Sequence, residues 1–282
     1  MTTPTISTHT LDAPGATITY DVRGTLGDGI PLVIFGSPMG ADGFAALADL
    51  FADRPVVTYD PRGAGRSTRT DGSGELTPED HAGDLARVVE VIDGGPVDVL
   101  ASSGGAVNAL AWVTQRAEQI RTLIAHEPPL ATLLPDRGAI DAAVQDMRRT
   151  YQHDGVGPAM AKFIALVMHD GQLSDDFEFP PLDPAQFGLP AGDDGRRDDA
   201  LLAQNIRTCT GYRPDVAALR ASPARIVLAR GAASGQSMAA RGADAIAALI
   251  GVQPVEFPGG HGAFMEVPDA FAQRLREVLE GA

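Results

Sequence analysis

Short apolar runs rich in β-branched residues alternate along most of the chain with longer alanine and leucine patterns at helical spacing. Each apolar run is bounded by Gly, Pro or Asp, as strands usually are. The runs predict strands over Thr17–Val22, Leu32–Phe35, Val56–Tyr59, Val97–Ala101, Thr122–Ala125, Ile226–Ala229 and Val255–Phe257. The longer patterns predict helices over Gly43–Ala52, Pro78–Asp93, Gly104–Arg116, Ser237–Gly251 and Pro268–Glu280. Such alternation predicts an α/β fold with a mostly parallel sheet covered by helices on both faces.

The alternation stops between Glu127 and Pro214, where no strand pattern is found. Short helical patterns replace it, over Ile140–His153, Pro158–His169 and Asp199–Thr208. We therefore expect a core built from residues 1–127 and 215–282, with a helical cap over residues 128–214. An insertion at this place is most simply a cap above a substrate pocket, although a stabilising decoration would give the same pattern.

Composition and charge narrow the class of protein. The chain has 282 residues, of which 44% are hydrophobic, and this is enough for a sizeable core. A formal net charge of −15 argues against binding to nucleic acid. No apolar run approaches the roughly 20 residues that cross a bilayer, and no signal pattern opens the chain. With Cys209 as the single cysteine, these features predict a cytoplasmic protein without an internal disulfide or a membrane partner.

The candidate nucleophile lies where the strand pattern ending at Ala101 breaks into Ser-Ser-Gly-Gly before a helix. A nucleophilic serine on a tight strand-to-helix turn gives this pattern. The turn brings the nucleophile's backbone against residues two positions away on either side, which must therefore be small. Ser103 has Ala101 and Gly105 at these positions, whereas Ser102 would have Leu100. We therefore predict Ser103 as the nucleophile.

A serine hydroxyl is a poor nucleophile at neutral pH and needs a base within hydrogen-bond reach. The chain has six histidines. His261 differs from the others because it lies in Pro-Gly-Gly-His-Gly-Ala-Phe, a loop between the last predicted strand and the last helix. The chain order serine, acid, histidine would place the base there. A histidine in a solvent-facing loop would look the same, but together with Ser103 the pattern favours a catalytic base.

The third group, an acid that orients the imidazole, is not where it is expected. After the penultimate predicted strand no carboxylate occurs before Asp244, inside the next helix, and Ser234 stands at the vacant position. The strand before it ends at Glu127. Neighbouring strands are about 4.8 Å apart, so an acid displaced by one strand can reach the same histidine. We predict Glu127 as the acid for His261; a carboxylate paired with an arginine is the alternative.

Negative charge that develops on a substrate oxygen needs preorganised donors, usually backbone N–H groups. Gly104 follows the nucleophile at the start of a helix, where the helix dipole also favours an anion. The loop after the strand ending at Phe35 reads Gly-Ser-Pro-Met-Gly. Pro38 cannot donate. The N–H groups of Ser37 and Gly104 are therefore the candidate oxyanion and substrate-binding groups.

The order and spacing of four motifs resemble the α/β-hydrolase superfamily. These motifs are Gly36-Ser-Pro, Asp60-Pro-Arg-Gly-Ala-Gly-Arg-Ser67, Ala101-Ser-Ser-Gly-Gly105 and Gly260-His-Gly262. The resemblance covers nearly the whole chain outside the predicted cap. It implies a mostly parallel eight-stranded sheet flanked by helices, a helical lid, a Ser-His-acid triad and no cofactor or metal.

Two departures from the family pattern stand out. Phe35 occupies the place where the family usually has histidine, and the acid after the penultimate strand is missing. A glutamate after the earlier strand resembles the arrangement in zearalenone-type lactonases and in some haloalkane dehalogenases. Dehalogenation is disfavoured because that chemistry uses an aspartate nucleophile, where this chain has Ser103.

The combined prediction is a serine hydrolase that cleaves a carboxylic ester or lactone through an acyl-enzyme intermediate. Two alternatives stay open on the same scaffold. One is a cofactor-free dioxygenase of a heteroaromatic ring, and the other is a ligand receptor with slow or no turnover. The partner is expected to be a small, apolar molecule, because the cap carries many Met and Phe residues, although core packing explains those residues equally well. A homodimer is left open.

Overall fold

The computed structural model describes residues 5–72, 74–93 and 95–281, and within them the strands form a single mixed sheet. The strands are β1 (Ile6–Ala13), β2 (Ala16–Arg23), β3 (Leu32–Phe35), β4 (Val56–Tyr59), β5 (Thr68–Arg69), β6 (Val97–Ser102), β7 (Ile120–His126), β8 (Arg225–Gly231) and β9 (Val255–Phe257). Eight of them follow the order β1-β2-β4-β3-β6-β7-β8-β9, and the short β5 pairs with β2. All neighbours from β4 to β9 are parallel, which confirms the predicted mostly parallel sheet.

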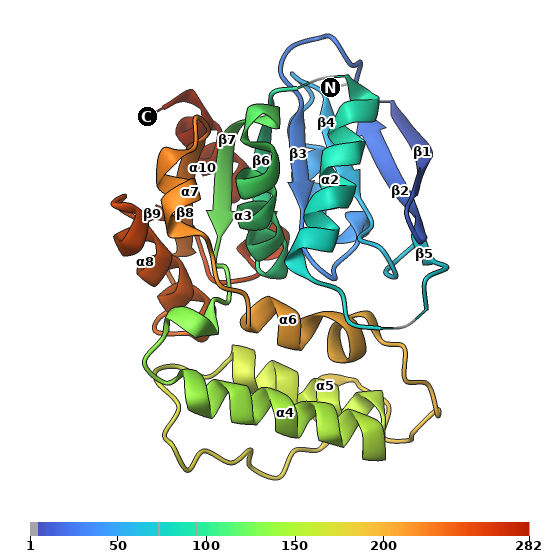
Figure 1. The fold of residues 1–282 in the computed structure, drawn as a ribbon, viewed down its shortest axis with the longest axis vertical. Helices are drawn as coiled ribbons and strands as arrows, with labels where there is room; N and C mark the ends of the chain where they lie inside the picture. Colours follow the sequence, from blue (N-terminus) through green and yellow to red (C-terminus); the bar gives the residue numbers. More distant parts are fainter. Residues whose placement is uncertain (1–4, 73, 94, 282) are drawn as a thin grey trace.

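Helices cover both faces of this sheet (Figure 1). One face carries α2 (Pro78–Ile92), α3 (Gly104–Arg116), α7 (Val216–Ala221) and α8 (Met238–Ile250), and the other carries α1 (Ala45–Ala48), α9 (Ala263–Glu266) and α10 (Pro268–Glu280). Two short 3₁₀ turns, η1 (Ala41–Phe44) and η2 (Ala117–Gln119), adjoin α1 and α3. Along β3, Val33 and Phe35 enter one core cluster while Leu32 and Ile34 enter the other, because successive side chains point to opposite faces.

The segment between β7 and β8 is helical, as its lack of strand patterns predicted. It contains η3 (Ala131–Leu133), α4 (Arg137–Asp154), α5 (Val156–Val167), η4 (Pro184–Phe187), η5 (Ala200–Asn205) and α6 (Ile206–Thr210), of which η5 is a π-helix. These helices lie beyond the carboxyl ends of the parallel strands (Figure 1). Side chains such as Ile140, Met147 and Leu202 give them a hydrophobic cluster of their own. We call residues 128–214 the cap segment.

Polar contacts attach the π-helical end of the cap segment to the core. Nε2 of His81 lies 2.7 Å from Oδ1 of Asn205, and both side chains are buried. Nη1 of Arg69 donates to Oε1 of Gln204 at 2.7 Å. The backbone N–H of Leu76 donates to the Gln204 carbonyl at 2.9 Å. These bonds fix the last part of the cap segment above the start of α2.

No helix among the residues that the structure describes is long and apolar enough to cross a membrane.

Candidate active site

Ser103 lies on a strained turn between β6 and α3. Its backbone has φ 57° and ψ −127°, a conformation that costs free energy in a residue with a side chain. The turn is held by a hydrogen bond from the Ser103 N–H to the His126 carbonyl, 2.9 Å long. A Cβ atom at Gly105 would lie 2.8 Å from Cα of Gly36, so only glycine fits two residues after Ser103.

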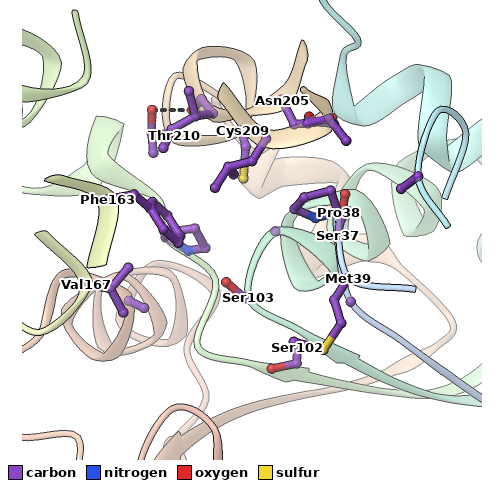
Figure 2. Close-up of a pocket in the computed structure, with 18 of the residues that line it drawn as sticks. Ser37, Pro38, Met39, Ser102, Ser103, Phe163, Val167, Asn205, Cys209 and Thr210 are labelled. Carbon is purple, nitrogen blue, oxygen red and sulfur yellow. Dashed lines mark hydrogen bonds between the residues drawn. The ribbon is translucent and has the colours of Figure 1, made fainter. Parts of the chain in front are cut away.

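The two adjacent serines point in different directions. Both serines line the cavity, and Figure 2 shows the Ser103 hydroxyl nearer to the cap helices than the Ser102 hydroxyl. Oγ of Ser102 lies 3.1 Å from Nδ1 of the buried His126. The free hydroxyl at this turn is therefore that of Ser103.

Glu127 follows directly after β7, and the sheet register decides which loop it meets. His126 pairs with Ala229 of β8, and the Glu127 N–H donates to the Ala229 carbonyl at 2.9 Å. Oε1 of Glu127 accepts the Gly231 N–H at 2.8 Å, and Oε2 lies 2.6 Å from Nδ1 of His261. The structure thus brings the predicted acid and the predicted base into direct contact.

The carboxyl group of Glu127 is ionised despite being fully buried. Burial alone would raise its pKa, but the hydrogen bond with His261 and the nearby imidazoles outweigh this effect and lower the pKa to about 2. An ionised carboxylate can only accept, so Nδ1 of His261 must carry the hydrogen of this bond. The Nε2 atom of the neutral ring then has a free lone pair that can accept a proton.

Ser234 stands at the position after β8 that the sequence left without an acid. Its buried hydroxyl faces Glu127 closely enough to lower the pKa of that carboxyl group. Within the described chain it completes no well-formed hydrogen bond. Asp244, the next carboxylate along the chain, instead forms an ion pair with Arg230. Ser234 thus stands where the family pattern leads one to expect an acid, and its hydroxyl lies close to Glu127.

His126 was given no role by the sequence, yet it contacts both His261 and Ser102. Its ring stacks on that of His261, with centroids 6.1 Å apart and an angle of 26° between the planes. Burial lowers the pKa of His126 to about 4, against a smaller opposing effect of Glu127. The ring is therefore neutral at neutral pH and places no second positive charge beside His261.

The two predicted oxyanion groups come from loops that are in close contact. A Cβ atom at Gly104 would lie 2.6 Å from the Ser37 carbonyl oxygen and 3.4 Å from Sγ of Cys209. The loop that carries Ser37 is held further along, where Oδ1 of Asp60 accepts the Ala41 N–H at 2.7 Å. The structure therefore places Ser37 and Gly104 beside each other at the start of α3.

A cavity of about 690 Å³ joins these groups, and Ser103, His261, Ser37 and Gly104 all line it. Among the described residues no hydrogen bond joins Ser103 to the His261 ring; such bonds often tighten only when substrate is bound. The walls are mainly apolar, as in most small-molecule sites. Lining side chains that the sequence left without a site role include Met39, Phe44, Asn108, Phe264 and Met265.

The cap segment supplies the roof of the cavity. Figure 2 shows Phe163 and Val167 of α5 on one side of the Ser103 hydroxyl and Cys209 of α6 above it. Burial raises the pKa of the Cys209 thiol to about 12, so this thiol stays protonated and offers no thiolate nucleophile.

Comparison with known proteins agrees with the fold. The family model for the alpha/beta hydrolase fold matches residues 31–216. The uncharacterized hydrolase YraK of Bacillus subtilis (strain 168) is 30% identical over 283 residues, which cover 98% of this chain and 97% of that protein. The chain therefore belongs to the α/β-hydrolase fold family.

Solved structures show the same fold at low sequence identity. A thermophilic esterase from Thermogutta terrifontis, with malate bound, superposes with a TM-score of 0.72 at 19% identity, covering 97% of this chain and 98% of that one. A putative aryl esterase from Burkholderia cenocepacia gives a TM-score of 0.69 at 17% identity, with the same shares of the two chains. These similarities support the arrangement of the sheet and helices.

Proposed function

We propose that the protein is a serine hydrolase that cleaves a carboxylic ester or lactone through an acyl-enzyme intermediate. The contact between Glu127 and His261, at the edge of the cavity that Ser103 lines, is the observation that carries this proposal. Two proteins with the same fold are named as an esterase and a putative aryl esterase, which gives additional support.

In this mechanism Oγ of Ser103 attacks the substrate carbonyl carbon while Nε2 of His261 takes the hydroxyl proton. The buried carboxylate of Glu127 fixes the ring tautomer and stabilises the imidazolium that forms. The N–H groups of Ser37 and Gly104 bind the oxyanion. As the tetrahedral intermediate collapses, the carbon–oxygen bond to the alcohol breaks, and His261 returns the proton to the leaving oxygen. Water then repeats the cycle on the acyl-enzyme.

The cap segment, with the boundaries 128–214, is in this proposal the part that shapes substrate choice. Phe163 and Val167 present apolar surface to the Ser103 hydroxyl. Three charged residues, Arg196, Asp198 and Asp199, also line the cavity, and Arg196 forms an ion pair with Asp198. A largely uncharged, apolar substrate fits such a wall best.

A hydrolysis panel of short esters, long esters and lactones tests this function. Wild-type protein should hydrolyse at least one of these classes, and Ser103→Ala should lower kcat by about 10³-fold or more, because the nucleophile acts as a unit with its base. Ser102→Ala is the matched control, since the Ser102 hydroxyl contacts the buried His126 and not His261, and it should keep activity within about tenfold of wild type. Full activity of the Ser103→Ala variant would disprove the proposal.

A further inference from the structure

Asn108 is a buried polar side chain in the cavity wall without a complete set of partners. It lies within α3, only 2% exposed, in a stretch otherwise composed of Gly, Ala, Val, Leu and Trp. It lines the cavity, and its Nδ2 atom has no hydrogen-bond partner in the part of the chain that the structure describes. Burying an amide in this way costs free energy, so a polar group on a ligand is the natural partner.

The position of Asn108 on its helix relates it to the reacting centre. Asn108 is four residues after Gly104, so both lie on the same face of α3, about 6 Å apart along the axis. Side chains on a helix lean toward its N-terminus, which here carries Ser103. The Asn108 amide is therefore directed toward the end of the cavity where the oxyanion is bound.

The order of the strands indicates whether the acyl group or the leaving alcohol of a substrate lies near the Asn108 amide. His261 and Glu127 follow β9 and β7, on one side of β6, whereas Ser37 follows β3 on the other side. A Cβ at Gly104 would face the Ser37 carbonyl oxygen, and Asn108 lies one turn later on the same helix face. A leaving alcohol must lie near His261 to receive its proton. The acyl group therefore extends to the opposite side, toward Asn108.

We propose that Asn108 determines specificity by donating a hydrogen bond from Nδ2 to a second oxygen in the acyl group, such as a ketone oxygen, beyond the scissile carbonyl. The substrate class is then an ester or lactone whose acyl part carries an additional carbonyl oxygen. This inference rests on the proposed hydrolase function and refines it. An ordinary alkanoyl chain would leave the amide unpaired and would be the poorer substrate.

The first test compares 4-nitrophenyl heptanoate with its 4-oxo, 5-oxo and 6-oxo analogues, which place a ketone at increasing distance from the ester. Wild-type enzyme should prefer one of the oxo esters over the heptanoate by about tenfold in kcat/KM, the factor expected for one hydrogen bond to a buried amide. Equal kcat/KM values for all four esters would overturn the inference without affecting the hydrolase assignment.

The second test replaces the amide. Asn108→Leu, or Asn108→Ala if the leucine variant does not fold, should bring the ratio between the preferred oxo ester and the heptanoate close to one. Thr114→Ala is the matched control, because Thr114 lies on the same helix and bonds to the Ala111 carbonyl away from the cavity. The control should keep the wild-type ratio. Retention of the preference in the Asn108 variants would also overturn the inference.

A binding measurement distinguishes a failure of the Asn108 inference from a failure of the hydrolase proposal. Calorimetry with the Ser103→Ala variant should show the preferred oxo ester binding about tenfold more tightly than the heptanoate. The same preference without any wild-type turnover would refute the hydrolase proposal and support the role of Asn108. Turnover that depends on Ser103, with no preference in either binding or rate, would support the hydrolase proposal and refute the role of Asn108.

Discussion

Oε2 of Glu127 lies 2.6 Å from Nδ1 of His261, although 134 positions separate the two residues in the chain. The parallel registers of β7, β8 and β9 make this contact possible, because they place Glu127 at the end of β8, beside the loop after β9 that carries His261. The proposed acid therefore follows β7, whereas the family pattern leads one to expect it after β8.

The first prediction concerns this acid. Glu127→Gln should lower kcat by about 10³–10⁴-fold with little change in KM, because the ring loses the carboxylate that fixes its tautomer and stabilises the imidazolium. Steady-state kinetics on the best ester of the panel measure the effect. Asp244→Asn serves as the control, since Asp244 pairs with Arg230, and it should stay near wild type. The opposite ranking of the two variants would identify Asp244 as the acid.

A second prediction follows from the closeness of Ser234 to the Glu127 carboxylate. Glu127→Ala removes the acid, and Ser234→Asp in the same chain supplies a carboxylate at the vacant position after β8. The double variant should recover about 10- to 100-fold of the kcat lost by Glu127→Ala alone, because a carboxylate reaches His261 again. A double variant no more active than Glu127→Ala would show that this position does not reach the ring.

The third prediction tests the oxyanion groups by adding a side chain at Gly104. A Cβ at Gly104 would meet the Ser37 carbonyl oxygen at 2.6 Å, so Gly104→Ala should displace one of the two donors and lower kcat by about 10²-fold. The control is Gly138→Ala, in α4, where a Cβ meets nothing within 4 Å and should leave kcat unchanged. Equal activity of the two variants would remove Gly104 from the oxyanion site.

Sequence patterns predicted the regular part of the fold because parallel strands buried on both faces leave continuous apolar runs. The edge strand β1 was missed because it is not buried and so leaves no apolar run. Its residues are largely exposed, its sequence Ile-Ser-Thr-His-Thr-Leu-Asp-Ala is mostly polar, and it is bound only to β2. Nothing in such a strand distinguishes it from a polar lead-in until its partner is known.

The candidate site shows a similar division. Ser103 could be chosen over Ser102 because the turn imposes a steric rule on its neighbours, and this rule can be read locally. The meeting of Glu127 with His261 depends on sheet order and register, which the sequence suggests only through strand spacing. Asn108 could have been noticed as a lone polar residue in an apolar helix, but its place in the cavity depends on how the cap segment folds over α3.

A fourth prediction concerns stability and pH. Burial lowers the pKa of His126 to about 4, below the ordinary value of 6.5, so the folded protein keeps this ring neutral where the unfolded chain protonates it. The unfolded state then binds more protons, and the free energy of unfolding falls as the pH drops from 6.5 toward 4. Between pH 6.5 and 4.5 this one group lowers the free energy of unfolding by on the order of 2 kcal/mol.

Urea unfolding at several pH values in this window tests the effect. The slope of the free energy of unfolding against pH reports how many more protons the unfolded state binds. His126→Asn should lower this number by close to one. The remaining slope is due to His81, whose pKa burial also lowers. Glu127 does not interfere, since its lowered pKa stabilises the fold above about 4.5 and that contribution is lost only as the pH falls toward 2. Ser102→Ala, which removes the partner of His126 but no titrating group, should keep the wild-type slope. An unchanged slope in His126→Asn would contradict the assignment.

The most direct test of the proposed serine hydrolase mechanism is the site of covalent labelling by a fluorophosphonate, identified by mass spectrometry of the digested protein. We expect one phosphonyl group per chain on Ser103, and a large loss of labelling in Glu127→Gln, because the buried carboxylate supports the base that activates this hydroxyl. Labelling of Ser102 instead, or labelling of Ser103 at the same rate with and without the Glu127 carboxylate, would contradict it.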